Sequence, residues 1–175
     1  MSILRDNNRL VFIDVETTGL KPAQGHRIIE IGAIAMENNQ IISEFQSLVQ
    51  VSYPIPRHVS KIHGITNDML AGQPTPEKIY PEVKDFISDS ILVAHNAKFD
   101  VGFLRSEFSR LNLHLQNPSI CTLKISRSRY PRLPNFKLST VYRHLVGTQP
   151  ADAKRHRALD DARMVSAIWM AMERK

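Results

Sequence analysis

The first apolar run of the chain is Leu10-Val-Phe-Ile-Asp-Val-Glu-Thr-Thr-Gly19. Residues 10–15 are mostly apolar, which predicts a buried β-strand. Asp14 and Glu16 interrupt the run two positions apart, so they share one face of an extended strand. Two carboxylates on one face repel each other unless a cation lies between them, and oxygen ligands without a supporting cysteine indicate Mg²⁺ or Mn²⁺. The alternative is that both acids lie in water at a fraying strand end.

The other predicted strands extend this one into a mixed sheet. Residues 27–36 and 40–51 read as two further strands, and the short polar link between them predicts an antiparallel hairpin. Residues 91–94 and 119–122 are short stretches that predict two more strands. Three strands in succession, followed by strands that alternate with helices, predict an α/β fold with a mixed five-stranded sheet flanked by helices.

Apolar residues at helical spacing predict the helices of the chain. Pro81 lies inside the first of these segments, and because proline is tolerated only near a helix start, the regular part should begin close to it. The loop 52–76 is rich in turn residues and should hold only one helical turn, at about 59–63. The expected helices are about 77–88, 100–111, 123–129 and 139–145, with a last one ending near Met172.

The chain has 175 residues, of which 42% are hydrophobic, and a single cysteine, Cys121. This is enough sequence to bury one core, so residues 1–175 are expected to form a single domain. No stretch approaches the roughly 18 to 20 apolar residues of a membrane span, and Met1 to Arg9 lack the apolar segment of a secretory signal. Without such a span, no membrane partner is expected. The lone cysteine excludes an internal disulfide, which fits a cytoplasmic location.

The net charge of +6 is concentrated in one segment. Residues 121–157 carry nine Lys and Arg side chains against Asp152 alone, whereas residues 1–120 carry 11 basic and 13 acidic side chains. A one-sided basic segment is a candidate binding surface for a polyanion, because each neutralised phosphate releases counterions. The alternative is a solvated basic face that maintains solubility.

A second polar cluster, His95-Asn-Ala-Lys-Phe-Asp100, follows the predicted strand 91–94. Ligands of open α/β sheets collect at the carboxyl ends of the strands, so Asp100 is well placed for chemistry. The alternative is that Asp100 caps the next helix or complements its dipole.

A third cluster lies at the start of the last helix, where His156 precedes Asp160 and Asp161. Asp161 can share a helical face with Val165 and Ile168 and so point inward, while Asp160 leans toward solvent. A histidine at this place can titrate near neutrality and act as a base. The alternative is an exposed loop histidine beside ordinary first-turn acids.

In their order and spacing, these clusters resemble the DEDDh family of 3′→5′ exonucleases, which includes the proofreading (epsilon) subunit of bacterial DNA polymerase III, exonuclease X, ribonuclease T and oligoribonuclease. The family motifs are similar to Asp14-x-Glu16-Thr-Thr-Gly19, to His95-Asn-x-x-Phe-Asp100 and to the pair His156 and Asp161. Two intervening segments, His63-Gly-Ile-Thr66 and Cys121-Thr-Leu123, also look like recurrent family segments. The likeness therefore covers about residues 10–172.

The resemblance implies a ribonuclease H-like fold whose four carboxylates converge on two divalent metal ions, Mg²⁺ or Mn²⁺. In that scheme Asp14 bridges both ions, Glu16 and Asp161 complete the ion on the nucleophile side, and Asp100 holds the ion on the leaving-group side. His156 would be the general base that takes a proton from the attacking water.

Three further positions correspond to substrate contacts in the family. Thr17 and His63 look like residues that line the pocket for the terminal nucleotide, and Phe99 looks like one that stacks on bases. Each has a structural alternative. The segments of Thr17 and His63 could simply form turns at Gly19 and Gly64, and Phe99 could belong to the core.

The expected function is a metal-dependent 3′→5′ exonuclease that hydrolyses single-stranded DNA and releases 5′-mononucleotides, with residues 121–157 drawing the strand toward the metals. Three alternatives stay open: the same chemistry on RNA, a binding module that no longer cleaves, although all five catalytic positions are filled, and the proofreading partner of a DNA polymerase. The few residues after the last helix favour a stand-alone nuclease if the chain is complete, and carry no weight if it is an excised domain. Nothing in the sequence specifies an oligomeric interface.

Overall fold

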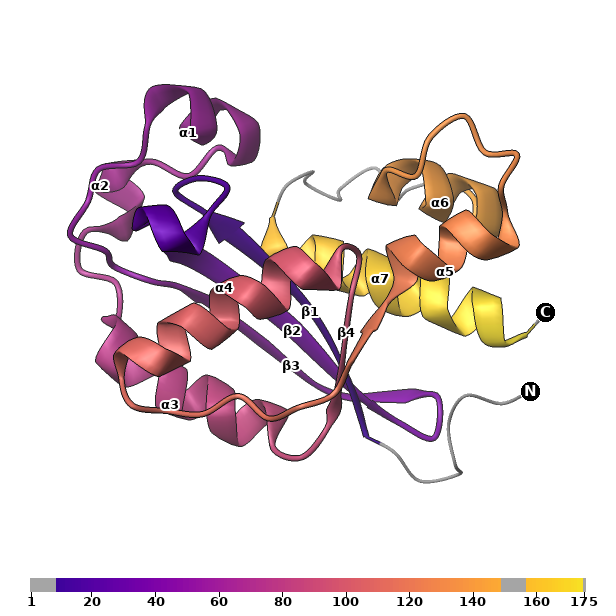
Figure 1. The fold of residues 1–175 in the computed structure, drawn as a ribbon, viewed down its shortest axis with the longest axis horizontal. Coiled ribbons are helices and arrows are strands. Elements are labelled where there is room, and N and C mark those ends of the chain that lie inside the picture. The colour runs from indigo at the N-terminus through magenta and orange to yellow at the C-terminus, as the bar shows by residue number, and fades with distance from the viewer. Residues whose placement is uncertain (1–8, 149–156, 175) are drawn as a thin grey trace.

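The computed structural model describes residues 9–148 and 157–174 (Figure 1). The strands in these residues are β1 (Leu10–Thr17), β2 (Ile28–Glu37), β3 (Gln40–Leu48), β4 (Ile91–Ala94) and β5 (Ser119–Cys121). They form one sheet in the order β3-β2-β1-β4-β5, in which β1 is antiparallel to β2 and parallel to β4, and β4 is parallel to β5. The predicted mixed five-stranded sheet is confirmed.

The β2–β3 pair is the antiparallel hairpin expected from the polar link between its strands. Asn38 and Asn39 both have positive φ, 50° and 61°, as a tight hairpin turn of type I′ requires. β3 ends at Leu48, earlier than predicted, whereas β1 runs two residues beyond its predicted end, to Thr17. Glu16 is therefore held within the sheet and not at a frayed strand end.

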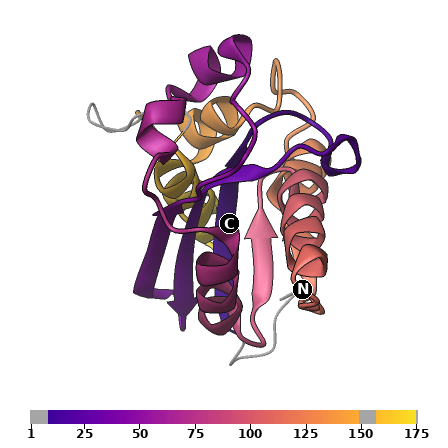
Figure 2. The same ribbon diagram turned by 90° about the vertical axis from the view of Figure 1, so that its left-hand side faces the viewer.

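Helices cover both faces of the sheet (Figures 1 and 2). In chain order they are the 3-10 helix η1 (Pro22–Gln24), α1 (Arg57–His63), α2 (Asn67–Leu70), α3 (Pro76–Ile87), α4 (Ala97–Arg110), α5 (Thr122–Arg129), α6 (Leu138–Leu145) and α7 (Ala158–Glu173). Helices α3 and α4 lie on one face, and α7, with α6 packed against it, lies on the other. In the described residues no helix is both long enough and apolar enough to cross a membrane.

Alternation along β1 decides which side chains meet which helix. Val11, Ile13 and Val15 belong to the core cluster that includes α3 and α4. Leu10 and Phe12 belong to the second cluster, with residues of α7. Because side chains alternate along a strand, Asp14 and Glu16 continue the second series and face the side of the sheet that α7 covers.

Helix α3 lies where it was predicted, at about residues 77–88, but its regular part starts earlier than expected. The helix begins at Pro76, five residues before Pro81, and not close to Pro81. Pro76 supplies the preformed φ of a first helical position, so the helix starts there. Pro81 has no N–H to donate to the Glu77 carbonyl one turn earlier. Because Glu77 and Pro81 are both exposed, this carbonyl can bond to water, and the proline is tolerated inside the helix.

The segment between β3 and α3 is more structured than expected. It holds two short helices, α1 and α2, where the sequence predicted one helical turn. Its apolar residues form a small cluster of their own, which includes Ile55, Ile65 and Leu70 and packs on Ile29 of β2. This cluster fixes α1 at the end of the sheet toward which β1 runs (Figures 1 and 2).

Candidate active site

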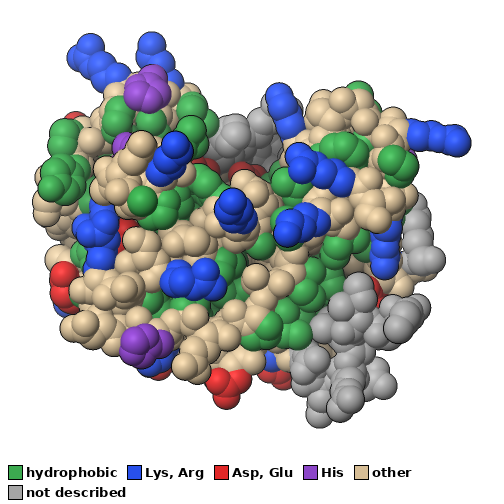
Figure 3. Space-filling view, viewed as in Figure 1, with side chains coloured by type: hydrophobic (Ala, Val, Ile, Leu, Met, Phe, Trp, Pro, Cys, Tyr) green, Lys and Arg blue, Asp and Glu red, His purple; other side chains and the backbone are tan. Residues whose placement is uncertain are grey.

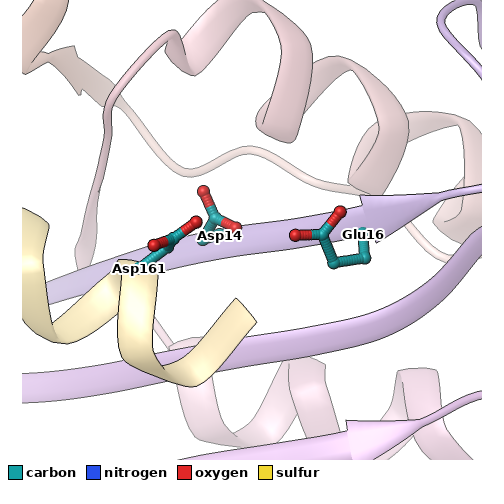
Figure 4. A group of neighbouring side chains, drawn as sticks. All are labelled: Asp14, Glu16 and Asp161. Carbon is teal, nitrogen blue, oxygen red and sulfur yellow. The ribbon is translucent and has the colours of Figure 1, made fainter. Parts of the chain in front are cut away.

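Three carboxylates converge between β1 and α7 (Figure 4). One oxygen of Asp14, one of Glu16 and one of Asp161 lie within 4.8 Å of one another. They meet because the two strand acids face α7 and Asp161 lies in the first turn of that helix. All three are half-buried, and Figure 3 shows acidic surface on the floor of the hollow between the α1 side and the α5–α6 side of the molecule.

Asp160 does not belong to this group. Its carboxylate accepts a hydrogen bond from Arg163 Nη1 at 2.9 Å, on the outer part of α7. Asp161 is instead the residue that joins the strand acids, so the prediction that it points inward is confirmed.

The fourth predicted acid, Asp100, approaches the group from α4. The chain turns from β4 into α4 at Asn96, whose φ of 109° is one that asparagine tolerates better than most residues. Asp100 lies in the first turn of α4, is only 4% exposed, and its charge acts on Asp14 and Asp161. It adjoins the cluster of three without being one of the three groups within 4.8 Å.

The acids raise one another's pKa. Burial, followed by repulsion from Asp100, Asp161 and Glu16, holds the pKa of Asp14 well above its ordinary value. Burial, followed by repulsion from Asp161, raises the pKa of Glu16 to about 8. Burial raises the pKa of Asp100 to about 7, although backbone hydrogen bonds oppose the shift. These acids cannot all ionise near neutral pH unless a cation joins them, so their oxygen donors fit a divalent metal site.

The predicted general base, His156, lies outside the described residues. The residue after it, Arg157, is the N-cap of α7. The role of His156 therefore stays a prediction that rests on the family resemblance.

A cavity of about 470 Å³ lies beside the acids and brings together the three predicted substrate residues. Thr17 and His63 are buried in its wall, and Phe99 is half-buried there, with its ring centroid 4.9 Å from that of Phe103. Thr17 Oγ1 donates to the Gly19 carbonyl at 2.6 Å, and the Ile65 amide donates to His63 Nδ1 at 3.0 Å. Glu16 is one of the residues that line the cavity, so the cavity adjoins the carboxylate cluster.

Several residues of this wall were not predicted from the sequence. They come from the segments around η1 and α1, which no helical or strand periodicity links to β1. These residues are Gln24, His26, Pro56, His58, Val59 and Ile62.

Gly19 is favoured by a close approach and not by a positive φ. A Cβ at this position would overlap the ring of His26. The same loop is closed by Thr18, whose hydroxyl accepts from the Arg27 amide at 3.0 Å and lies 3.3 Å from His26 Nδ1. The Thr-Thr-Gly segment is thus a fixed wall of the cavity.

His95, the first residue of the second motif, has a structural place instead of one among the carboxylates. Its Nε2 lies 2.8 Å from the Phe136 carbonyl and its Nδ1 lies 3.0 Å from Thr122 Oγ1. Burial lowers its pKa, so the ring is neutral at physiological pH. His95 therefore ties the end of β4 to the start of α5 and to the loop before α6.

Comparison with known proteins agrees with this site. Residues 11–169 match the family model described as Exonuclease. The chain is 41% identical over 170 residues to the PolC-type DNA polymerase III of Halalkalibacterium halodurans, covering 97% of this chain but 12% of that protein. It is 34% identical over 171 residues to DNA polymerase III subunit epsilon of Aquifex aeolicus, covering 95% of this chain and 83% of that one. The chain thus spans about a tenth of the length of the PolC-type relatives.

Solved structures give the same assignment of fold. Exonuclease X in complex with 5′-overhanging duplex DNA superposes with a TM-score of 0.73 at 29% identity, covering 95% of this chain and 92% of that one. The zinc-bound E. coli ExoI–ssDNA complex superposes with a TM-score of 0.85 at 20% identity, covering 96% of this chain and 41% of that one. The sheet is the ribonuclease H-like one that was expected, and the chain belongs to the Exonuclease family, whose members depend on divalent metal.

Proposed function

We propose that this protein is a metal-dependent 3′→5′ exonuclease that hydrolyses single-stranded DNA and releases 5′-mononucleotides, with residues 1–175 acting as one exonuclease domain. The observation that carries the proposal is the convergence of Asp14, Glu16 and Asp161 within 4.8 Å, beside a cavity that Glu16 also lines. Exonuclease X and ExoI, which share the fold, have been solved with overhanging and single-stranded DNA.

The four carboxylates Asp14, Glu16, Asp100 and Asp161 would hold two divalent ions, Mg²⁺ or Mn²⁺. When bound, such ions lower the pKa of the attacking water and stabilise the departing 3′-oxygen. Asp14, on which the charges of Asp100, Asp161 and Glu16 all act, would be the central ligand of this group. His156 would accept the proton that the attacking water releases.

The chain's own residues would hold the last nucleotide in the cavity. Thr17 and His63 form buried polar wall, and the ring of Phe99 offers a flat face on which a base can stack. A nucleotide held there with its 5′-phosphate toward Glu16 would place the scissile bond at the carboxylates. The positioning of the bond follows from the fixed loop of Thr17, Thr18 and Gly19.

Two choices within this proposal depend on relatives. DNA is favoured over RNA because both solved structures hold DNA, and RNA is the alternative substrate. Proofreading for a DNA polymerase is the second candidate function, since the relatives at 34–41% identity are DNA polymerase III chains. The cytoplasmic location remains a prediction.

The direct test uses matched single-stranded DNA and RNA oligonucleotides labelled at the 3′ end. With Mg²⁺ or Mn²⁺, the label should leave as a 5′-mononucleotide, faster from DNA than from RNA, and a chelator should stop its release. Faster release from RNA would favour the alternative substrate. If neither oligonucleotide lost its label with either metal, the proposed activity would be wrong.

The exposed charges of α4 are all positive. Lys98, Arg105 and Arg110 are exposed, whereas the two acids of the helix, Asp100 and Glu107, are buried. Basic side chains gather on this face and on the α5–α6 side (Figure 3). A strand whose 3′ end enters the cavity would meet this surface with its upstream phosphates.

Residues 121–148 continue the positive surface, since they contain six basic side chains and no acid. All six are exposed. Arg129 also donates to the Met172 carbonyl at 3.0 Å, so its removal would loosen α5 from α7 as well as change the charge. Arg127, which lies over the ring of Phe136 at 5.8 Å, and Arg132 are better probes of binding.

The double variant R127Q/R132Q should raise the KM for DNA and leave kcat within about twofold, because these residues would bind phosphates and not the scissile bond. The slope of log(kcat/KM) against log salt should flatten by about 0.7 for each phosphate that is no longer neutralised. K78Q/K84Q, which removes two exposed charges from α3, is the control that should leave the slope unchanged. If R127Q/R132Q kept the wild-type salt slope, these basic side chains would not bind the DNA phosphates, and their role would be to maintain solubility.

A further inference from the structure

We propose that Glu30 and Arg157 form a positioning pair, which holds the first turn of α7 against β2 and thereby places the Asp161 carboxylate beside Asp14 and Glu16. The inference rests on the proposed function, because it assigns the pair a role in assembling the metal site. Neither residue belongs to the four acids or to the cavity wall.

Glu30 is a fully buried carboxylate whose hydrogen bonds join β2 to α7 and to β3. Its Oε1 accepts from Arg157 Nη2 at 2.6 Å and from Gln46 Nε2 at 2.9 Å. Its Oε2 accepts from Arg157 Nε at 3.1 Å and from the Ala158 amide at 3.1 Å. The carboxylate thus holds both the N-cap side chain of α7 and the first amide of that helix.

These bonds give Glu30 partners outside the metal-ligand group, although its charge still acts on Asp14 and Glu16. Glu30 is the register partner of Glu16 in the β1–β2 ladder, and so it lies on the same face of the sheet as the site. A carboxylate there without a partner would be a fifth acid beside the cluster. Because both of its oxygens are occupied by donors from α7 and β3, Glu30 acts as an anchor for the helix.

The anchored turn leads directly to Asp161. The Asp161 amide donates to the Arg157 carbonyl at 3.0 Å, so the pair and the ligand are joined through one turn of helix. The helix also packs closely at this point, because a Cβ on Gly32 of β2 would overlap the Leu159 amide nitrogen. A small displacement of this turn would therefore move the Asp161 oxygen relative to the two acids of β1.

Glu30→Gln keeps the size of the side chain and leaves Arg157 without its charged partner. It should weaken Mn²⁺ binding, measured by calorimetry, by about tenfold or more, as loss of a supporting group does at metal sites. In metal-free protein it should speed hydrogen exchange of the amides of residues 158–162. On folded protein, kcat should fall while the KM for DNA stays within about twofold, because the substrate cavity is untouched.

Two control variants separate this role from stability alone. Glu107 is a buried carboxylate that also binds an arginine, Arg27, through two bonds of 2.7 Å, but it lies two turns beyond Asp100 on α4. Glu107→Gln should lower the melting temperature yet leave Mn²⁺ affinity and α7 exchange at wild-type values. Glu44→Gln breaks an exposed ion pair from β3 to Arg163 of α7 and should change neither.

Arg157→Lys keeps the charge but loses the forked pair of N–H donors. Its Mn²⁺ affinity and its α7 hydrogen exchange should therefore lie between those of wild type and Glu30→Gln. If Glu30→Gln does not fold, Arg157→Lys alone tests the proposal. Wild-type Mn²⁺ affinity and exchange in both variants would overturn the positioning role and leave the proposed function intact. If the wild-type protein bound no Mn²⁺ and released no nucleotide, the proposed function would fail. The exchange of α7 would then still decide whether the pair holds the helix.

Discussion

Asp14→Asn should abolish nucleotide release while making the metal-free protein more stable. Asp14 is the acid that adjoins all the others, and its loss should remove several kcal/mol of metal-supplied transition-state stabilisation, or about 10³-fold in kcat. The same change removes a charge that repels Glu16, Asp100 and Asp161. The clustered acids are needed for metal binding, but their repulsion destabilises the metal-free fold. Removing the charge of Asp14 should therefore lower activity and raise stability.

The stability effect has a defined direction with pH. The pKa of Glu16 is raised to about 8 and that of Asp100 to about 7, above the values of these groups in an unfolded chain. A raised pKa contributes stability that is present at acidic pH and is lost as the pH rises through the folded-state pKa. Metal-free wild type should therefore lose stability from about pH 5 to pH 8, and Asp14→Asn should lose less.

Melting curves in chelator at pH 5 and pH 8 measure this difference. At pH 8 the variant should melt above the wild type by about 2–4 °C, which corresponds to about 1 kcal/mol for a domain of this size, and the gap should shrink at pH 5. Asp160→Asn is the matched control, because Asp160 binds Arg163 outside the cluster. Equal activity in wild type and Asp14→Asn, or a variant less stable than wild type at pH 8, would contradict the assignment.

His156→Ala should slow hydrolysis by about 10²–10⁴-fold with little change in DNA binding, because a general base acts in the chemical step. In the wild type with saturating metal, kcat/KM should fall at acidic pH as the imidazole of a general base becomes protonated. The variant should lack this limb. His114→Ala, on an exposed loop before β5, is the control that should keep both the rate and the limb.

Pre-steady-state rates on a labelled oligonucleotide, with binding followed by fluorescence anisotropy, separate the two effects of His156→Ala. A variant that binds DNA as tightly as wild type but turns over slowly supports the role. A variant with the wild-type rate and pH profile would exclude His156 as the base.

The positions of the acids follow from local periodicity, which is why the sequence predicts them. Side chains alternate between the two faces of a strand, so Asp14 and Glu16 share one face of β1. In a helix, neighbouring side chains point in different directions, which separates Asp161 from Asp160. The anchoring of Glu30 by a basic or backbone group was also predictable, since a carboxylate in an apolar strand needs a partner. Its identity as Arg157 was not, because the two residues are 127 positions apart and no local pattern joins them.

The parts that the sequence did not predict depend on packing between distant segments. The cavity wall formed by α1 and η1 exists because a small cluster including Ile55 and Ile65 fixes α1 near the end of β1. The early start of α3 at Pro76 depends on Pro81 being exposed, which a one-dimensional pattern does not give. The motif that contains His95 assigned it no role, and its place became clear only from its bonds to Thr122 and the Phe136 carbonyl, 27 and 41 positions away.

The most direct test of a metal centre acting on 3′ ends follows a 5′-labelled single-stranded DNA oligonucleotide over time with wild type and Asp14→Asn. With Mn²⁺, the wild-type protein should shorten the strand one nucleotide at a time from its 3′ end, and both a chelator and the Asp14→Asn substitution should leave it intact. Release of the 5′ label as a mononucleotide, cleavage within the strand, or equal shortening by Asp14→Asn would contradict a carboxylate-bound metal centre with this polarity.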